Sequence, residues 1–232
     1  MTSAAENTAL LLFTRSAPAE ARIKALLPKH REARQLAAAM NQGACQLAQA
    51  TRLSLFIVDE TTQAGSDFSS RFRSAFTQVF SQGFDRVIAI GNDCPELTID
   101  LIRRAQLQLQ SVDMVLGPSH DGGVYLMGLS QCGFNKLDFD ALPWQTGQLF
   151  ARLLEVSSDW NRHYALPYLH DIDSFEELHH LFLSRLLPNW FHQILTCFLA
   201  ENIPDCPSAF AKKSRADTFQ KQLRAPPVAC FR

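Results

Sequence analysis

Residues 86–95, RVIAIGNDCP, constrain the fold of this chain more than any other stretch. The apolar run VIAI predicts a strand that is buried on both faces, and such strands are typical of parallel sheets in α/β proteins. Gly91 ends the run, and Asp93 follows at the break. Because open α/β sheets bind ligands beyond the carboxyl ends of their strands, Asp93 is either a functional carboxylate in a crevice or an ordinary residue of the turn.

The rest of the chain alternates between strand-like and helix-like segments. Short apolar runs predict strands at residues 9–13, 53–58, 113–117, 124–129 and 164–169. Apolar residues at helical spacing predict helices at residues 32–50, 68–80, 98–110 and 146–156 and from 174 onward, with Thr98 and Ser174 as N-caps. This alternation predicts a three-layer α/β fold. The close spacing of the strands at 113–129 predicts that its mostly parallel sheet is mixed.

Composition and charge exclude several classes of protein. The 232 residues include 22 basic and 23 acidic ones, and the formal charge of -1 provides no field that would favour nucleic acid. No apolar run approaches the ~18 residues of a membrane span. The N-terminal sequence lacks the basic region of a secretory leader, and the six cysteines include no C-x-x-C pair. We therefore expect a reduced cytoplasmic protein that binds neither nucleic acid nor a membrane.

The chain divides into three parts by composition. Residues 8–180 carry the alternating pattern and form the predicted α/β domain. Residues 181–210 are dense in large apolar side chains and predict a helical appendage. Its wide apolar stripe from Trp190 to Leu199 must be covered by the protein's own core, by the second subunit of a homodimer or by a membrane surface. We expect the core or the second subunit, because the polar side of this helix has almost no basic residues that would attract anionic lipid. Residues 211–232 are rich in Lys and Arg and predict a poorly ordered basic tail.

Three polar turns follow predicted strands, and they have the sequences GNDCP at 91–95, GPSHDGG at 117–123 and HDID at 170–173. Hard oxygen ligands on separate strand ends suit Mg²⁺ that is shared with a phosphate, because this ion keeps several waters and takes only one or two carboxylates. The Asp-Gly-Gly segment equally suits a tight hairpin turn. In the HDID turn, we expect only one of Asp171 and Asp173 to face a given ion.

Four motifs in this order, GNDCPELT, VLGPSHDGGVYLMGL, LPWQTGQLF and HDIDSFEEL, resemble those of a bacterial family with the GT-A-like nucleotide-diphospho-sugar transferase fold. The family is that of the glycosyltransferases of the selenodomain-associated type. The chain is more distantly similar to the guanylyltransferases of molybdenum cofactor and phospholactate biosynthesis. The resemblance covers residues 8–180. It implies Mg²⁺ or Mn²⁺ as cofactor, a nucleotide sugar or nucleoside triphosphate as donor, and a small-molecule acceptor.

The resemblance also implies roles for single residues. Asp93 matches the metal-binding aspartate of the family's Gly-x-Asp-x-Pro turn, and a second metal contact is expected from Asp171 or Asp173. Asp121 matches an aspartate on the acceptor side, where it would orient an acceptor hydroxyl or act as its base. The substrate-binding positions that the resemblance implies are Gly122, Gly123, Trp144 and Thr146.

The N-terminal loop departs from the family pattern. Relatives carry Lys-x-Pro-x-x-Gly-x-x-Lys-Thr-Arg-Leu, a flexible basic loop over the nucleotide phosphates, whereas this chain has RSAPAEARIKAL at residues 15–26. The missing glycine removes a close backbone approach to phosphate. Arg15, Arg22 and Lys24 still supply positive charge for a donor phosphate.

Two functions of different class remain open at this point. The first is a metal-dependent transferase of a glycosyl or nucleotidyl group from a nucleotide-activated donor. The second is a degenerate member of the same fold that binds a nucleotide or a partner protein without turnover. Retention of all three carboxylate turns favours the enzyme, and the altered basic loop favours the binding protein.

Overall fold

The computed structural model describes residues 7–199 apart from 25, 159, 161–162 and 185–186. The chain forms two compact units, Met1–His180 and Leu181–Arg232. The basic tail predicted at 211–232 lies outside the described residues, and so does the predicted end of the appendage at 200–210.

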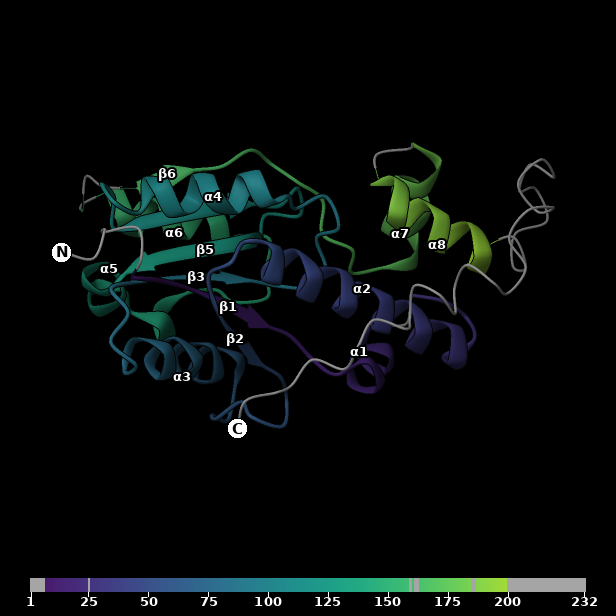
Figure 1. The fold of residues 1–232 in the computed structure, drawn as a ribbon, viewed down its shortest axis with the longest axis horizontal. Helices are drawn as coiled ribbons and strands as arrows, with labels where there is room; N and C mark the ends of the chain where they lie inside the picture. The colour runs from purple at the N-terminus through teal and green to yellow at the C-terminus, as the bar shows by residue number, and fades with distance from the viewer. Residues whose placement is uncertain (1–6, 25, 159, 161–162, 185–186, 200–232) are drawn as a thin grey trace. The chain divides into compact units, whose positions relative to one another are not determined.

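A six-stranded sheet forms the centre of the first unit (Figure 1). Its strands are β1 (Thr8–Phe13), β2 (Ser54–Val58), β3 (Arg86–Ile90), β4 (Met114–Pro118), β5 (Val124–Ser130) and β6 (His163–Ala165). They lie in the order β2-β1-β3-β5-β4-β6, with β5 antiparallel to both of its neighbours and the other pairs parallel. The prediction of a mostly parallel, mixed sheet is confirmed.

The helices follow the strands as the alternating sequence pattern predicts. They are α1 (Ala17–Ile23), α2 (His30–Ala50), α3 (Phe68–Phe80), α4 (Ile99–Gln108), α5 (Gln131–Lys136), α6 (Leu149–Ser158), α7 (Phe175–Leu183) and α8 (Asn189–Leu199), with a 3-10 turn η1 at Phe139–Ala141. Thr98 is the N-cap of α4, because its side chain accepts a hydrogen bond from the N–H of Leu101. Before α7, Ser174 Oγ accepts from the N–H of Glu177, and the Glu177 carboxylate accepts from the N–H of Ser174.

The short helices α1 and α5 were not predicted from the sequence, and two further elements have different bounds from those predicted. Helix α6 begins at Leu149 and not at residue 146, because the chain at Thr146 forms a turn in which the Leu149 N–H bonds to the Thr146 carbonyl. Strand β6 ends at Ala165, although the apolar pattern continues to Leu169. Pro167 lacks the N–H that a sheet ladder requires, so pairing resumes only as a single bridge between Leu169 and Ser119.

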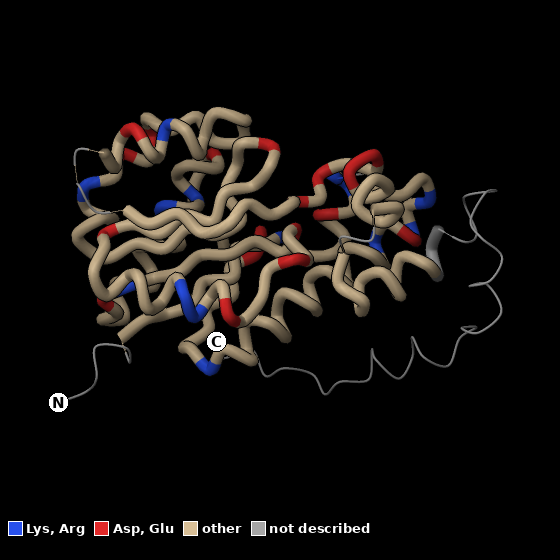
Figure 2. Tube along the Cα trace, turned by 90° about the horizontal axis from the view of Figure 1, so that it is seen from above, with Lys and Arg blue, Asp and Glu red and all other residues tan. Residues whose placement is uncertain are grey.

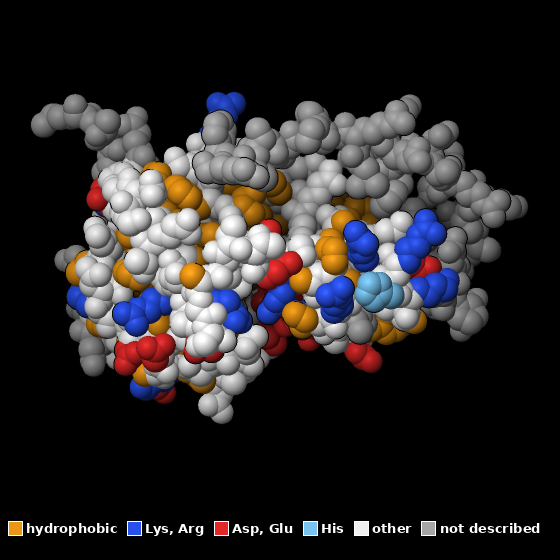
Figure 3. Space-filling view, turned by 90° about the horizontal axis from the view of Figure 1, so that it is seen from below, with side chains coloured by type: hydrophobic (Ala, Val, Ile, Leu, Met, Phe, Trp, Pro, Cys, Tyr) orange, Lys and Arg blue, Asp and Glu red, His pale blue; other side chains and the backbone are white. Residues whose placement is uncertain are grey.

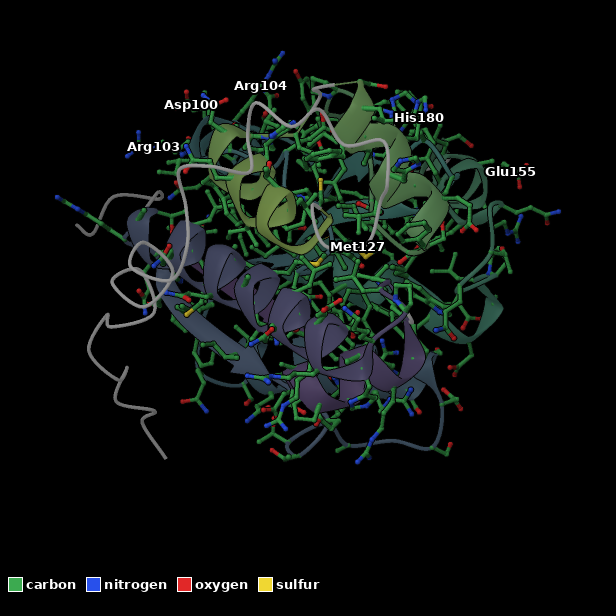
Figure 4. The ribbon with its side chains drawn as sticks, turned by 90° about the vertical axis from the view of Figure 1, so that its right-hand side faces the viewer. Asp100, Arg103, Arg104, Met127, Glu155 and His180 are labelled. Carbon is green, nitrogen blue, oxygen red and sulfur yellow. The ribbon has the colours of Figure 1, made fainter. Side chains whose placement is uncertain are left out.

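The sheet has a hydrophobic core on each face, which makes the unit three-layered. Alternate residues of β1 divide between the two cores, since Leu11 packs with α3 and α6 while Leu10 and Leu12 pack against α4 and the end of α2. In Figure 4, Met127 of β5 lies inside the molecule, whereas Arg103 and Arg104 project outward from α4. The layers leave the carboxyl ends of β1 and β3 available to build a site.

The described part of the second unit contains α8 and the end of α7. Phe191 and Leu195 are fully buried, whereas Trp190 is 39% exposed, so the apolar stripe is covered along its centre and open at one edge. Among the described residues, none of the helices is both long enough and apolar enough to cross a membrane.

Candidate functional site

Asp93 follows directly on the buried strand β3, as the sequence predicts. Gly91 has no Cβ, and this allows the Asp93 carboxylate to fold back, since a Cβ there would lie 2.6 Å from Asp93 Oδ1. The Asp93 carbonyl accepts a 2.9 Å hydrogen bond from the N–H of Ile172. This bond joins the turn after β3 to the HDID segment, which lies far away in sequence.

A cavity of about 350 Å³ opens beside these two turns. Its acidic lining residues come from several elements, and they are Glu20, Asp93, Asp121, Asp171 and Asp173. Its basic lining residues are Arg15, Lys24 and Arg71. Figure 2 shows several acidic positions close together where strands of the sheet end. As the sequence predicts, the aspartates of the three polar turns open onto one crevice.

Both aspartates of the HDID segment line the cavity, whereas we expected only one of them to face a given ion. Residues two apart in an extended segment project on the same side. Ile172, between them, points the other way and is fully buried. Asp171 is mostly buried, whereas the Asp173 side chain is 50% exposed.

Lys24 lies between the acidic groups of the cavity. Its Nζ is 2.9 Å from Asp93 Oδ2 and 2.5 Å from Asp173 Oδ1, and it also pairs with Glu20 Oε1 at 3.4 Å. It donates a further hydrogen bond to the carbonyl of Ile172 at 3.3 Å. The Lys24 side chain is only 12% exposed. Its ammonium therefore neutralises carboxylates that are contributed by three separate segments.

Burial and charge shift the acidities of these groups in opposite directions. Burial lowers the pKa of Lys24, but the charges of Asp93, Asp173 and Glu20 outweigh it, so the pKa rises above its usual value. Burial raises the pKa of Asp93, but the charge and hydrogen bond of Lys24 outweigh it, so the pKa falls. At Asp173 burial exceeds the opposing effect of Lys24, and the pKa rises.

Among the described residues, no lysine or arginine pairs with Asp171 as Lys24 does with Asp93 and Asp173. Burial, together with the charge of Asp93, raises the pKa of Asp171 to about 8, and a hydrogen bond with Ser119 offsets this in part. Its Oδ1 atom is buried and has no hydrogen-bond partner. The raised pKa favours the protonated form of Asp171 near neutral pH.

The glycine-rich turn joins β4 to β5 and is closed by its own aspartate. Asp121 Oδ1 accepts hydrogen bonds from the Ser119 hydroxyl and from the N–H of Gly123 at 2.9 Å. Gly122 has a φ of +89°, and a Cβ there would lie 2.1 Å from the carbonyl oxygen of Gly147. The Asp-Gly-Gly segment can therefore be a tight hairpin turn and part of the site at once, because Asp121 and Gly123 line the cavity within this turn.

The cavity lining also contains aromatic rings. They include those of Phe13, Phe68, Phe72 and Trp144. Trp144 Nε1 donates a 2.6 Å hydrogen bond to the carbonyl of Phe139, and its ring lies 5.3 Å from that of Phe68. Thr146 also lines the cavity, and its hydroxyl bonds to the carbonyl of Pro143 at 2.7 Å. Trp144 and Thr146 therefore both line the site, and the polar side-chain atom of each is hydrogen-bonded to a backbone carbonyl.

The predicted basic residues divide into two groups. Arg15 and Lys24 line the cavity, and Arg15 pairs with Glu20 at 3.4 Å. Arg22 is exposed and is not among the lining residues. Figure 3 shows basic side chains gathered over the right-hand part of one face, and the exposed basic residues of α1 and α2 include Arg22, Arg31 and Arg34. Gly122 is likewise absent from the lining.

Sequence reasoning missed residues that organise the site from outside the motifs. Glu20 is buried, with a side chain 3% exposed, and it holds both Arg15 and Lys24. Asn41 of α2 donates a 2.8 Å hydrogen bond to the Arg15 carbonyl and accepts one from Asn92. Only the place of Asn92 inside the GNDCP turn could have signalled its role.

Glu96 is a further residue that sequence reasoning missed. Its Oε2 accepts from the N–H of His170 at 2.8 Å and lies 2.9 Å from His170 Nδ1. Together with the bond between Asp93 and Ile172, this contact fixes the HDID segment to the turn after β3. The sequence could have signalled this role of Glu96, because the residue lies two positions after Cys94, within GNDCPE.

The family resemblance of the sequence implies a divalent metal ion, and the residues of the cavity suit one chemically. Carboxylates are hard oxygen ligands, and the buried Oδ1 of Asp171 lacks a partner. Asp93, Asp171 and Asp173 are the residues that would hold Mg²⁺ or Mn²⁺. Within the described residues, no three acidic, histidine or cysteine side chains are already arranged to hold a metal ion. The ammonium of Lys24 fills the place between two of the carboxylates.

A sequence profile for the family described as "Uncharacterized protein conserved in bacteria (DUF2064)" matches residues 23–146, which is more than half of the chain. The chain belongs to this family. The match includes the Asp93 turn and the Asp-Gly-Gly turn. No curated protein matches the chain.

The chain is similar to several solved structures, and the first one described here shares its fold. A candidate nucleotide-diphospho-sugar transferase from Desulfovibrio desulfuricans G20 is 21% identical with a TM-score of 0.73, over 84% of this chain and 96% of that protein. Rv0371C in complex with manganese, from Mycobacterium tuberculosis H37Rv, is 16% identical with a TM-score of 0.45, over 77% and 99%. A cytidylyltransferase from Leptospira borgpetersenii is 13% identical with a TM-score of 0.42, over 84% and 94%. The first of these establishes the nucleotide-diphospho-sugar transferase fold, which is GT-A-like.

Proposed function

We propose that this protein is a cytoplasmic, metal-dependent transferase of the selenodomain-associated type, which moves a glycosyl or nucleotidyl group from a nucleotide-activated donor to a small-molecule acceptor. The observation that carries the proposal is the convergence of Asp93, Asp121, Asp171 and Asp173 on one cavity that also contains Lys24 and Arg15. A mixed acidic and basic cavity at the strand ends suits a phosphate-bearing donor together with a cation.

In this proposal the carboxylates of Asp93, Asp171 and Asp173 hold Mg²⁺ or Mn²⁺. The ion, when bound, would neutralise charge on the departing phosphate oxygens. Arg15, which lines the cavity, contacts the donor phosphate, and Lys24 does so once it is free of the aspartates. Arg22 is exposed outside the lining, so it contributes at most a long-range attraction.

Asp121 is assigned to the acceptor. Its Oδ1 already accepts two hydrogen bonds, from Ser119 and Gly123, and this leaves Oδ2 to orient an acceptor hydroxyl or to take its proton. The acceptor oxygen forms its bond to the transferred group while the bond to the donor phosphate oxygen breaks. No covalent intermediate on the protein is required.

The second candidate is a protein that binds a nucleotide without turnover. One observation favours it: Lys24 bridges Asp93 and Asp173, so two of the three proposed metal ligands already have a counter-ion. The absence of the loop glycine points the same way.

A thermal-shift panel separates the two candidates. It comprises nucleoside diphosphates, triphosphates and nucleotide sugars, each with Mn²⁺ and with EDTA. A ligand at a hundredfold excess over its dissociation constant stabilises the folded protein by about 2.7 kcal/mol. The transferase predicts a shift that requires Mn²⁺, followed by release of a nucleotide product when an acceptor is present. Shifts that are equal with Mn²⁺ and with EDTA favour the binding protein, and a flat panel contradicts a donor site.

A further inference from the structure

We propose that Lys24 is a tethered counter-ion that competes with the divalent cation for Asp93 and Asp173, so that the cation binds only when the ammonium leaves. This inference rests on the metal-binding part of the proposed function, and it assigns Lys24 a regulatory role at the same site.

The geometry makes the two cations mutually exclusive. Lys24 Nζ lies 2.9 Å from Asp93 Oδ2 and 2.5 Å from Asp173 Oδ1. Mg²⁺ binds carboxylate oxygens at about 2.0–2.1 Å, so an ion held by both oxygens would occupy the volume of the ammonium. Two positive charges at such a separation also repel each other strongly in a partly buried site.

Lys24 is held by the fold and is not an exposed side chain that happens to lie near two acids. Its side chain is 12% exposed, and it also contacts the Ile172 carbonyl at 3.3 Å and Glu20 at 3.4 Å. Glu20 is itself buried and has Arg15 as a second partner. When Lys24 leaves, Glu20 therefore keeps a counter-ion, and only Asp93 and Asp173 lose theirs.

The length and flexibility of the lysine side chain make this exchange possible. Its charge is a compact point on a four-carbon stem, so the ammonium can move several ångströms without a change in the backbone. The short helix α1 (Ala17–Ile23) ends just before Lys24, which is therefore not fixed within a helix. The displaced ammonium is then available to a donor phosphate.

Binding of Mn²⁺ alone to the full-length protein, measured by calorimetry in the absence of nucleotide, tests the proposal. Lys24→Met removes the charge and keeps most of the side-chain volume. The matched control is Lys29→Met, which removes the same charge from an exposed ion pair with Glu32 at 3.0 Å. We expect Lys24→Met to bind Mn²⁺ tighter than the wild type by about tenfold or more, because the competing charge is gone. Lys29→Met should bind as the wild type does.

The wild-type protein gives a second readout that does not depend on the folding of a variant. Lysine acetylation by an amine-reactive ester, mapped by peptide mass spectrometry, reports the accessibility of each ammonium. Addition of Mn²⁺ should raise the reactivity of Lys24 severalfold while leaving that of Lys29 unchanged.

Several outcomes overturn the proposal. They are equal or weaker Mn²⁺ binding by Lys24→Met, unchanged acetylation of Lys24, and the absence of Mn²⁺ binding by both wild type and variant. Equal binding by wild type and variant would leave the proposed transferase intact. Tighter binding by Lys24→Met without any nucleotide binding would support the counter-ion and contradict the transferase.

Discussion

Replacement of Asp171 by Asn should make the stability of the protein less dependent on pH. Burial and the nearby Asp93 charge raise the pKa of Asp171 from its ordinary value of 3.8 to about 8. Between these two pH values the unfolded chain has released the proton and the folded protein still holds it, so the wild type loses stability as the pH rises. Asn carries no titrating proton, so Asp171→Asn does not undergo this loss.

The magnitude follows from the size of the shift. One pKa unit corresponds to 1.36 kcal/mol, so a rise of about four units corresponds to a difference on the order of 5 kcal/mol at pH 8 and above. The free energies of unfolding of wild type and Asp171→Asn should therefore be similar near pH 4. They should then diverge up to about pH 8, with the variant more stable.

Urea unfolding measured from pH 4 to pH 9 in EDTA tests this prediction. The matched control is Asp100→Asn, at an exposed aspartate of α4 that Figure 4 shows on the outside of the molecule. This variant controls for the loss of an aspartate that does not line the cavity. The reasoning is refuted if the curve of Asp171→Asn runs parallel to the wild type, because Asp171 would then titrate alike in the folded and unfolded chains.

Two further substitutions test the packing. Gly122→Ala places a Cβ 2.1 Å from the Gly147 carbonyl oxygen, so the melting temperature of this variant should fall well below that of Gly83→Ala. Gly83 is a matched control, because it has a similar φ of +91° and an added Cβ would have no atom within 4 Å. Equal losses of melting temperature would show that the close approach is not the cause. The double variant Phe191→Asp and Leu195→Asp introduces charges at two fully buried positions. Size-exclusion chromatography should therefore show aggregation or loss of an oligomer, with no dependence on lipid. A variant that elutes unchanged and has only stopped binding anionic vesicles would contradict this.

Much of the fold could be predicted because its signals are local. The continuous apolar run of β3, the cap at Thr98 and the reciprocal bonds of Ser174 and Glu177 each depend on residues a few positions apart. The end of β6 was predicted too late, because the apolar pattern of residues 164–169 outweighed the effect of Pro167 on sheet pairing.

The site could be predicted only in part, because its decisive contacts join distant segments. The aspartates were found from their motifs, but nothing near Lys24 in sequence signals that its ammonium reaches both Asp93 and Asp173. The burial of Glu20 depends in the same way on the packing of α1. Sequence therefore located the carboxylates and Lys24, but not the ion pairs that join them.

The most direct test of the proposed function is calorimetric binding of the nucleotide that gives the largest Mn²⁺-dependent thermal shift, compared between wild type and Asp93→Asn. The substitution keeps the size of the side chain and removes the charge that would hold the ion. We predict unchanged cooperative unfolding and Mn²⁺-supported binding weakened by about tenfold or more, because a neutral amide attracts the cation far less than a carboxylate does. Equal Mn²⁺-supported binding by wild type and Asp93→Asn would contradict the assignment of Asp93 and the metal-dependent function built on it.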